Sequence, residues 1–317
     1  MLPMVPKYQD KAINVLGARM HVLRAGDGPP LLLVHGLVGA AANWKKSIDA
    51  LAPHASIYAI DQLNMGKSQR VDSLDASLEA TADRLAAAMD ALNLTQADIA
   101  GHSHGGAVAL MLAARHQERV RRLILFAPAN PYSHPADRLV RIFSTRIGRL
   151  VAKIGPNLPA RLQQAGLNRV YGDPSRIPDG CLQGYIEDLR VPGTMQHILT
   201  IVQGWFANMA RLERVLPLVA DVPTLLLWGD RDCAVELRSA TQLQRILRRS
   251  ELHVIRGGGH VLFEEFPEES NRIVLDWLRR DPGHCPIIAS DEPARVRAPR
   301  RSSIPTHGSV QPLTHGT

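Results

Sequence analysis

The sequence is poor in aromatic residues, in cysteine and in long apolar runs. Aromatic side chains make up 4% of its 317 residues. That leaves few rings to stack on bases, and no recognition motif accompanies the basic charge, so we expect no nucleic-acid partner. No apolar run approaches the roughly 18 residues needed to cross a membrane, and the first residues lack the apolar core of a signal peptide. The three widely spaced cysteines, at positions 181, 233 and 285, predict reduced thiols, no metal site and a cytoplasmic location.

The bulk composition is that of a globular protein. Hydrophobic residues make up 45% of the chain and charged residues 21%. The length allows one large domain with an insertion and a sizeable core. The net charge of +7 has to be interpreted through its distribution along the chain.

Strand and helix patterns alternate along most of the chain. Residues 12–16 and 20–24 alternate apolar with polar around Gly17, which predicts a β-hairpin. Short apolar runs, typical of buried parallel strands, recur between amphipathic helices. They occupy residues 31–34, 56–60, 97–100, 120–126, 224–228 and 252–255. We therefore predict an α/β fold with a mostly parallel central sheet covered by helices on both faces.

The alternation stops between two of these strands. Residues 129–216 show helical periodicity and no convincing strand, which predicts a helical cap inserted between two parts of a core, 1–128 and 217–280. Residues 281–317 hold six prolines and little apolar periodicity, so we expect a disordered tail.

One motif carries a chemical signal. Residues 101–105 read G-x-S-x-G, with an apolar run before them and an Ala/Leu-rich helical run behind. This is the strand–turn–helix context of a nucleophile elbow, in which Ser103 is held exposed beside a base. A Gly/Ser loop before an ordinary helix is the other interpretation of this motif, and the rest of the chain has to decide between the two.

Two later loops offer the partners that such a serine needs. Asp230 and Asp232 follow one predicted strand, and His260 follows the next, after three glycines. Reacting groups in open parallel sheets gather on loops at the carboxyl ends of the strands. The order serine, acid, histidine is that of α/β-hydrolases.

With these three loops, the chain resembles cap-bearing members of the α/β-hydrolase family over residues 12–280. The resemblance implies that the acid is Asp232, the last residue of W-G-x-x-D, while Asp230 caps the loop. Asn130, where some relatives carry the acid, cannot ionise, which also favours Asp232. Ser103 would attack a carbonyl carbon, His260 would shuttle the proton and Asp232 would orient the imidazole. The resemblance also implies an oxyanion hole made by the backbone N–H groups of Leu37 and His104.

Other histidines and one cysteine have plainer interpretations. His35 and His102 match family positions, and we expect them to shape loops rather than carry protons. The His104 side chain either lines the pocket or packs under the cap. We expect His253 to be structural and Cys233 to pack, because no base is placed to activate its thiol.

The predicted cap suggests how substrate is held. Trp205, Phe206 and Met209, with Met195, are candidates for an apolar acyl pocket, although packing inside the cap explains them equally well. Residues 136–154 form a basic amphipathic pattern. Either its apolar side packs inward with a solvated arginine face, or it makes a peripheral membrane contact that delivers lipid-like esters.

The resemblance predicts a serine hydrolase acting on a small ester-like substrate through an acyl-enzyme, without metal or cofactor. The same triad also serves C–C hydrolases of ring-fission products, thioesterases, amidases and perhydrolases, and the fold does not separate them. Ser103 argues against dehalogenases and epoxide hydrolases, whose nucleophile in this fold is Asp. A non-enzymatic binding protein on the same fold is the alternative from another class.

Overall fold

A computed structural model describes residues 8–134, 137–281 and 296–297. Of the predicted disordered tail, only Asp281 and a two-residue strand lie within these ranges, so that prediction otherwise falls outside the described residues.

The fold is built on a twisted sheet in the order β1-β2-β4-β3-β5-β6-β7-β8-β9. Only the pairs β1–β2 and β2–β4 are antiparallel, and every other neighbouring pair is parallel. The strands are β1 Gln9–Val15, β2 Ala18–Ala25, β3 Pro30–Val34, β4 Ser56–Ile60, β5 Ala97–His102, β6 Val120–Phe126, β7 Thr224–Gly229, β8 Ser250–Ile255 and β9 Val296–Arg297. The mostly parallel sheet and the N-terminal hairpin predicted from the sequence are both confirmed. Leu16 and Gly17, both with positive φ, form the hairpin turn.

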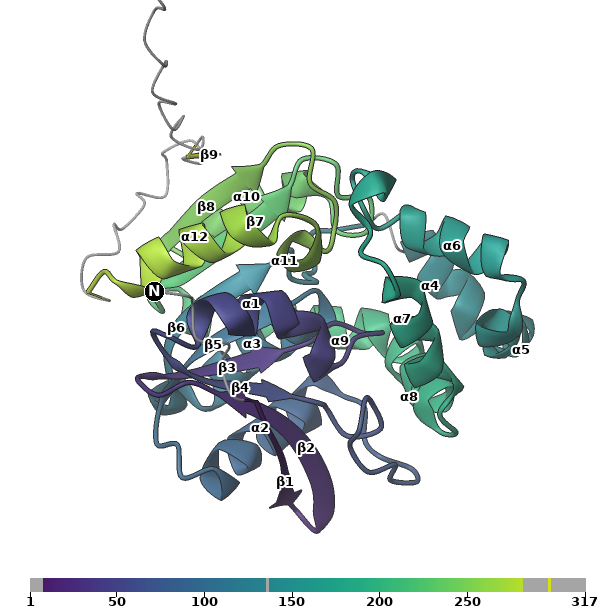
Figure 1. The fold of residues 1–317 in the computed structure, drawn as a ribbon, viewed down its shortest axis with the longest axis horizontal. Coiled ribbons are helices and arrows are strands. Elements are labelled where there is room, and N and C mark those ends of the chain that lie inside the picture. Colours follow the sequence, from purple (N-terminus) through teal and green to yellow (C-terminus); the bar gives the residue numbers. More distant parts are fainter. Residues whose placement is uncertain (1–7, 135–136, 282–295, 298–317) are drawn as a thin grey trace, which may run out of the picture.

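Helices cover both faces of the sheet (Figure 1). One core cluster packs helices α2, α3 and α10 against the sheet, and a second cluster packs α1, α11 and α12 against the opposite face. These helices are α1 Lys45–Leu51, α2 Leu78–Ala91, α3 His104–Arg115, α10 Leu237–Ile246, α11 Leu262–Glu265 and α12 Pro267–Leu278. The central strands β3, β5, β6 and β7 are buried on both faces, which explains their continuous apolar runs.

The described residues between β6 and β7 form helices joined by turns, with no strand among them, and most of this segment stands beside the sheet as a cap (Figure 1). Its helices are α4 Asp137–Ser144, α5 Arg146–Ile154, α6 Ala160–Asn168, α7 Cys181–Arg190, α8 Thr194–Gln203 and α9 Trp205–Val215. The basic amphipathic pattern of residues 136–154 is divided at Thr145, whose side chain accepts a hydrogen bond from the Gly148 N–H and caps α5. Among the described residues, none of the helices combines the length and apolar character needed to span a membrane.

Candidate active site

Ser103 lies in the sharp turn between β5 and α3. Its backbone has φ 52° and ψ −121°, an uncommon conformation for a residue with a side chain. The neighbouring glycines are required by space. A Cβ on Gly101 would come within 2.6 Å of the Gly105 carbonyl oxygen, and one on Gly105 within 2.3 Å of the His35 oxygen. The carbonyl of Ser103 accepts a hydrogen bond from the Ala129 N–H at 2.8 Å, which fixes the turn against the end of β6.

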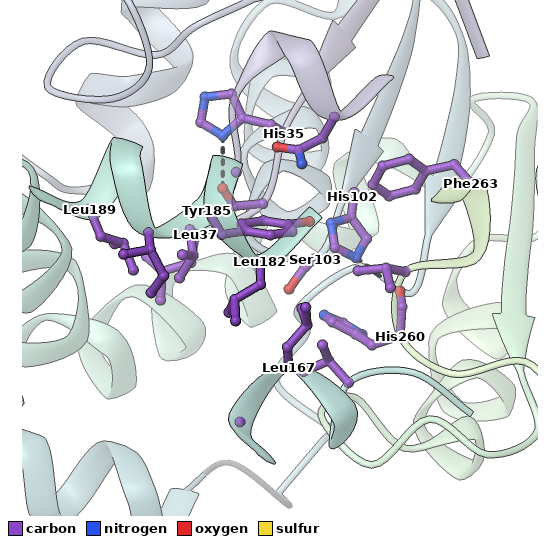
Figure 2. A pocket seen from close by; sticks show the side chains of 18 of the residues that line it. His35, Leu37, His102, Ser103, Leu167, Leu182, Tyr185, Leu189, His260 and Phe263 are labelled. Carbon is purple, nitrogen blue, oxygen red and sulfur yellow. Dashed lines mark hydrogen bonds between the residues drawn. The ribbon is translucent and has the colours of Figure 1, made fainter. Parts of the chain in front are cut away.

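His260 and Asp232 meet beside this turn. His260 Nδ1 lies 2.8 Å from Asp232 Oδ2, and the side chains of both residues are almost wholly buried. The other carboxylate oxygen of Asp232 accepts the backbone N–H groups of Ala234 and Val235 at 2.8 and 2.9 Å. These bonds hold the carboxylate in place for the imidazole. The structure thus brings together Ser103, Asp232 and His260, with Ser103 and His260 projecting into one pocket (Figure 2).

The other candidate acids occupy structural positions. Asp230 accepts the Gly257 N–H at 2.7 Å and so caps the loop that leads to His260, as the sequence predicts. The Asn130 amide donates to the Pro128 carbonyl and to the Ser239 hydroxyl. Among the described residues, neither Asp230 nor Asn130 forms a hydrogen bond to the His260 imidazole, whereas Asp232 does.

The two backbone donors expected for an oxyanion come from two different loops beside Ser103. His104 is the first residue of α3, where backbone N–H groups have no partner within the helix. Leu37 follows the His-Gly pair after β3 and lines the same pocket as Ser103. The oxyanion hole expected from the sequence remains a prediction for these two N–H groups.

His35 and His102 shape these loops. His35 Nδ1 donates to the Gly36 carbonyl at 2.8 Å, and its Nε2 accepts the Gln62 N–H at 3.1 Å. His102 Nε2 donates to the backbone carbonyl of His260 at 3.0 Å, tying the serine turn to the histidine loop. Burial holds the pKa of His102 well below its usual value, so this bridge is uncharged.

The His104 side chain packs under the cap and does not line the pocket. Its ring is 2% exposed, and its centroid lies 6.3 Å from that of Trp205. Neither ring nitrogen has a hydrogen-bond partner. Burial, together with the nearby His197, lowers the pKa of His104 to about 3. The residue that follows Ser103 therefore carries a buried, neutral imidazole without a hydrogen-bond partner.

The pocket beside Ser103 is a cavity of about 360 Å³ between the core loops and cap helices α6 and α7. Polar lining comes from Asn43, Gln163 and Tyr185 besides the histidines and Ser103. No Lys, Arg, Asp or Glu is among its described lining residues. The apolar lining side chains are Leu37, Val38, Leu167, Val170, Leu182, Ile186, Leu189, Val261 and Phe263 (Figure 2).

The acyl-pocket prediction for Trp205, Phe206 and Met209 is wrong, because none of the three lines this pocket. Met209 is buried in the core cluster and Trp205 packs against that cluster. Phe206 is 40% exposed, with the guanidinium of Arg141 5.4 Å from its ring centroid. These side chains belong to α9, which packs on α3, whereas α6 and α7 form the wall of the pocket.

A buried carboxylate joins cap and core, and sequence reasoning missed it. Glu264, on α11 just after the histidine loop, accepts hydrogen bonds from Tyr171 at 2.7 Å and Tyr185 at 2.8 Å, both from the cap segment. Asn43 donates to the same carboxylate at 2.9 Å. Burial and the Glu264 charge raise the pKa of the Tyr185 hydroxyl far above its usual value, so it remains a donor. The network fixes α7, the helix that supplies Leu182, Tyr185, Ile186 and Leu189 to the pocket.

Adjacent contacts strengthen this junction. Glu265 accepts the Gly259 N–H at 2.7 Å and the Asp173 N–H at 2.7 Å, so one carboxylate spans the histidine loop and the cap. The His260 N–H donates to the Val170 carbonyl at 2.7 Å. Cys233 is exposed, and its thiol donates a hydrogen bond to the Arg169 carbonyl.

Comparison with known proteins agrees with this arrangement. Residues 29–267 match the family model described as alpha/beta hydrolase fold. The chain belongs to the α/β hydrolase fold family. The resemblance inferred from the three loops is therefore confirmed, and so is the α/β-hydrolase fold predicted from it.

Two curated relatives of this hydrolase are bacterial enzymes. The chain is 29% identical to the 2-hydroxymuconate semialdehyde hydrolase of Pseudomonas sp. (strain CF600), over 84% of this chain and 93% of that one. It is 27% identical to the 2-hydroxy-6-oxo-2,4-heptadienoate hydrolase of Pseudomonas putida (strain F1), over 83% and 93%. Among solved structures, the meta-cleavage product hydrolase CumD of Pseudomonas fluorescens IP01 matches with a TM-score of 0.71 at 24% identity, over 84% of this chain and 97% of that one.

Proposed function

We propose that this hydrolase cleaves a neutral carboxylic ester with an apolar acyl group, through an acyl-enzyme on Ser103. The observation that carries the proposal is the composition of the pocket. Many of its described lining residues are aliphatic. No Lys, Arg, Asp or Glu is among them, so only a histidine could carry charge there. Burying a charged group without a partner is costly, so this pocket favours an uncharged, apolar substrate.

The proposed mechanism uses Ser103 and His260, which line the pocket, and Asp232, which contacts the His260 ring. Ser103 Oγ attacks the ester carbonyl carbon while His260 Nε2 accepts its proton, and Asp232 stabilises the imidazolium from the Nδ1 side. The N–H groups of Leu37 and His104 receive the oxyanion. His260 then protonates the departing alcohol. Water, activated by His260, releases the acid from Ser103.

C–C bond hydrolysis is the second candidate. It is supported by the two Pseudomonas relatives, a 2-hydroxymuconate semialdehyde hydrolase and a 2-hydroxy-6-oxo-2,4-heptadienoate hydrolase. A dienoate carries a carboxylate, which needs a cationic or strongly donating partner once it leaves water. The described lining of the pocket offers no Lys or Arg for that role. Only Asn43, Gln163 and Tyr185 add polar side chains to the histidines and Ser103, and Tyr185 already donates to Glu264. The lack of a cationic lining residue supports ester cleavage over C–C hydrolysis in our proposal.

One experiment separates the two reactions. Initial rates are measured on p-nitrophenyl esters from short to long acyl chains and on a 2-hydroxy-6-oxo-dienoate, with native protein and Ser103→Ala. We expect turnover of the esters, none of the dienoate, and loss of activity in the variant. Preferred turnover of the dienoate would overturn the ester proposal. If the protein neither turns over any of these substrates nor reacts with a fluorophosphonate, a binding protein is favoured instead.

A further inference from the structure

Helix α5 packs into the cap through its small residues. Gly148 is its buried residue, and a Cβ at that position would lie 1.9 Å from the Ile142 carbonyl oxygen of α4. Ala152, one turn later, is half-buried. Because side chains four residues apart share one side of a helix, this small side is the one that α5 turns toward the rest of the cap.

The apolar side of α5 therefore remains in solvent. Ile147, Leu150, Val151 and Ile154 follow the helical spacing of one stripe, and their exposed fractions are 77%, 69%, 53% and 53%. The expectation that this apolar side packs inward is thus wrong for α5. Two further exposed leucines, Leu158 and Leu162, follow along the chain. We call these six side chains the cap patch. An amphipathic helix normally buries such a stripe, so an exposed one indicates an interaction surface.

Positive charge surrounds the cap patch. Arg146 and Lys153 are exposed on another side of α5, and Arg141 and Arg161 are exposed on the neighbouring helices. The sequence contains seven Lys and Arg residues between Asp137 and Asp173, and no acidic residue between those two positions. A helix with an apolar stripe and flanking cations is the pattern of a segment that lies in a membrane interface.

Helix α6 connects the cap patch with the pocket. Leu162 is exposed on this helix, while Gln163, Gly166 and Leu167 line the cavity beside Ser103. Helices α5 and α6 lie at the outer edge of the cap, away from the central sheet (Figure 1). An apolar surface that contacts the cap patch would therefore be separated from the pocket by helix α6 alone.

We propose that the cap patch docks this protein on an anionic lipid bilayer. The apolar stripe enters the boundary between headgroups and acyl chains, and the flanking cations meet anionic headgroups. A second copy of this chain fits the patch less well, because a symmetric contact would place its unbalanced cations against one another. This docking does not rest on the reaction proposed above, since binding is measured without turnover.

The test is flotation of the full chain with vesicles. Vesicles of phosphatidylcholine alone are compared with vesicles that also contain phosphatidylglycerol, at low and at high salt. We expect binding to the anionic vesicles at low salt and release at high salt. Leu150→Glu should lower the partition coefficient by about tenfold or more, because it places a charge in the apolar stripe. The double variant Arg146→Gln/Lys153→Gln should lower it by about 25-fold, since each cation near an anionic surface contributes about fivefold.

Matched controls change equivalent residues elsewhere. Leu218→Glu alters a leucine that lies outside the cap patch and is 59% exposed. Arg245→Gln/Arg256→Gln removes two cations that are exposed on the surface of the domain that holds the sheet. Both should bind as the native chain does, and melting curves check that every variant folds. The proposal fails if native protein stays in the aqueous phase, or if variant and control lose binding equally. A dimer that Leu150→Glu dissociates, without vesicle binding, would assign the patch to a second copy and overturn the proposal.

Discussion

The loops around Ser103 and the outer helices of the cap differ in how far their side chains are engaged by neighbouring residues. Asp232 accepts three hydrogen bonds, and His260 is held both by its ring and by its backbone N–H. On α5, by contrast, a whole apolar stripe has no cover within the described residues. A reacting group must be held within fractions of an ångström, whereas a docking surface needs only exposed area and charge of one sign. One chain thus combines a closely hydrogen-bonded candidate site with an exposed apolar surface.

The largest expected effect separates these two regions directly. Ser103→Ala should lower kcat/KM on the preferred ester by at least about four orders of magnitude, because the attacking oxygen is lost. Its melting temperature and its vesicle binding should stay those of the native protein. Initial rates and flotation on the same preparation measure both. Ester turnover within about tenfold of native would remove Ser103 from the mechanism.

The catalytic region was the more predictable one, because its signals are local. The buried strands are short apolar runs, and Ser103, Asp232 and His260 each follow a strand at the same edge of the sheet. Glycine spacing around Ser103 reports a close backbone approach that the structure contains. Patterns of this kind follow from chain geometry, so they indicated the sheet and placed Ser103, His260 and the pair Asp230 and Asp232 at one edge of it. The choice of Asp232 came from the resemblance to the family.

The cap was predictable only as a set of helices. Apolar side chains on α9 resemble pocket residues until the packing of α9 against α3 is known. Tyr185 and Glu264 are 79 positions apart, and no periodicity links them. The outward stripe of α5 depends on Gly148 fitting against Ile142, a tertiary contact. Thr145 was a readable N-cap signal that would have divided the basic pattern into two helices.

The second effect tests the junction between the two regions. Glu264→Gln keeps the shape of the side chain but replaces one acceptor oxygen with an amide nitrogen, which cannot accept a hydrogen bond, so either Tyr171 or Tyr185 loses its acceptor. One tyrosine hydrogen bond is lost and the other no longer has a charged acceptor. Since a hydrogen bond to a charged group contributes about 1.5–3 kcal/mol, we expect the free energy of unfolding to fall by about 3 kcal/mol. KM should also rise, because α7 forms one wall of the pocket. Denaturant unfolding and initial rates measure these two changes.

Glu268→Gln is the control for that substitution, because Glu268 is exposed and lies four residues further along. It should change neither stability nor KM appreciably. If Glu264→Gln is as stable as this control, the carboxylate does not hold the cap. If stability falls while KM stays the same, the junction supports the fold without shaping the pocket.

The smallest effect concerns His104, whose buried imidazole has no hydrogen-bond partner. Burial depresses the pKa of His104 to about 3, so below pH 6.5 the unfolded chain binds a proton that the folded chain does not. Stability attributable to this residue is therefore complete above about pH 6.5 and is lost progressively as the pH falls toward 3. His104→Met removes that proton linkage and should gain about 2 kcal/mol more, relative to native protein, at pH 5 than at pH 8.

Denaturant unfolding at the two pH values measures that gain, and His54→Met provides the control because His54 is exposed. The control should behave as native protein at both pH values. Ester turnover at pH 8 should survive His104→Met, since the proposed oxyanion donor at this position is the backbone N–H and the side chain lies outside the pocket. An equal gain at both pH values would show that packing, rather than protonation, limits stability here. Loss of turnover with an intact fold would instead place the imidazole in the chemistry of Ser103.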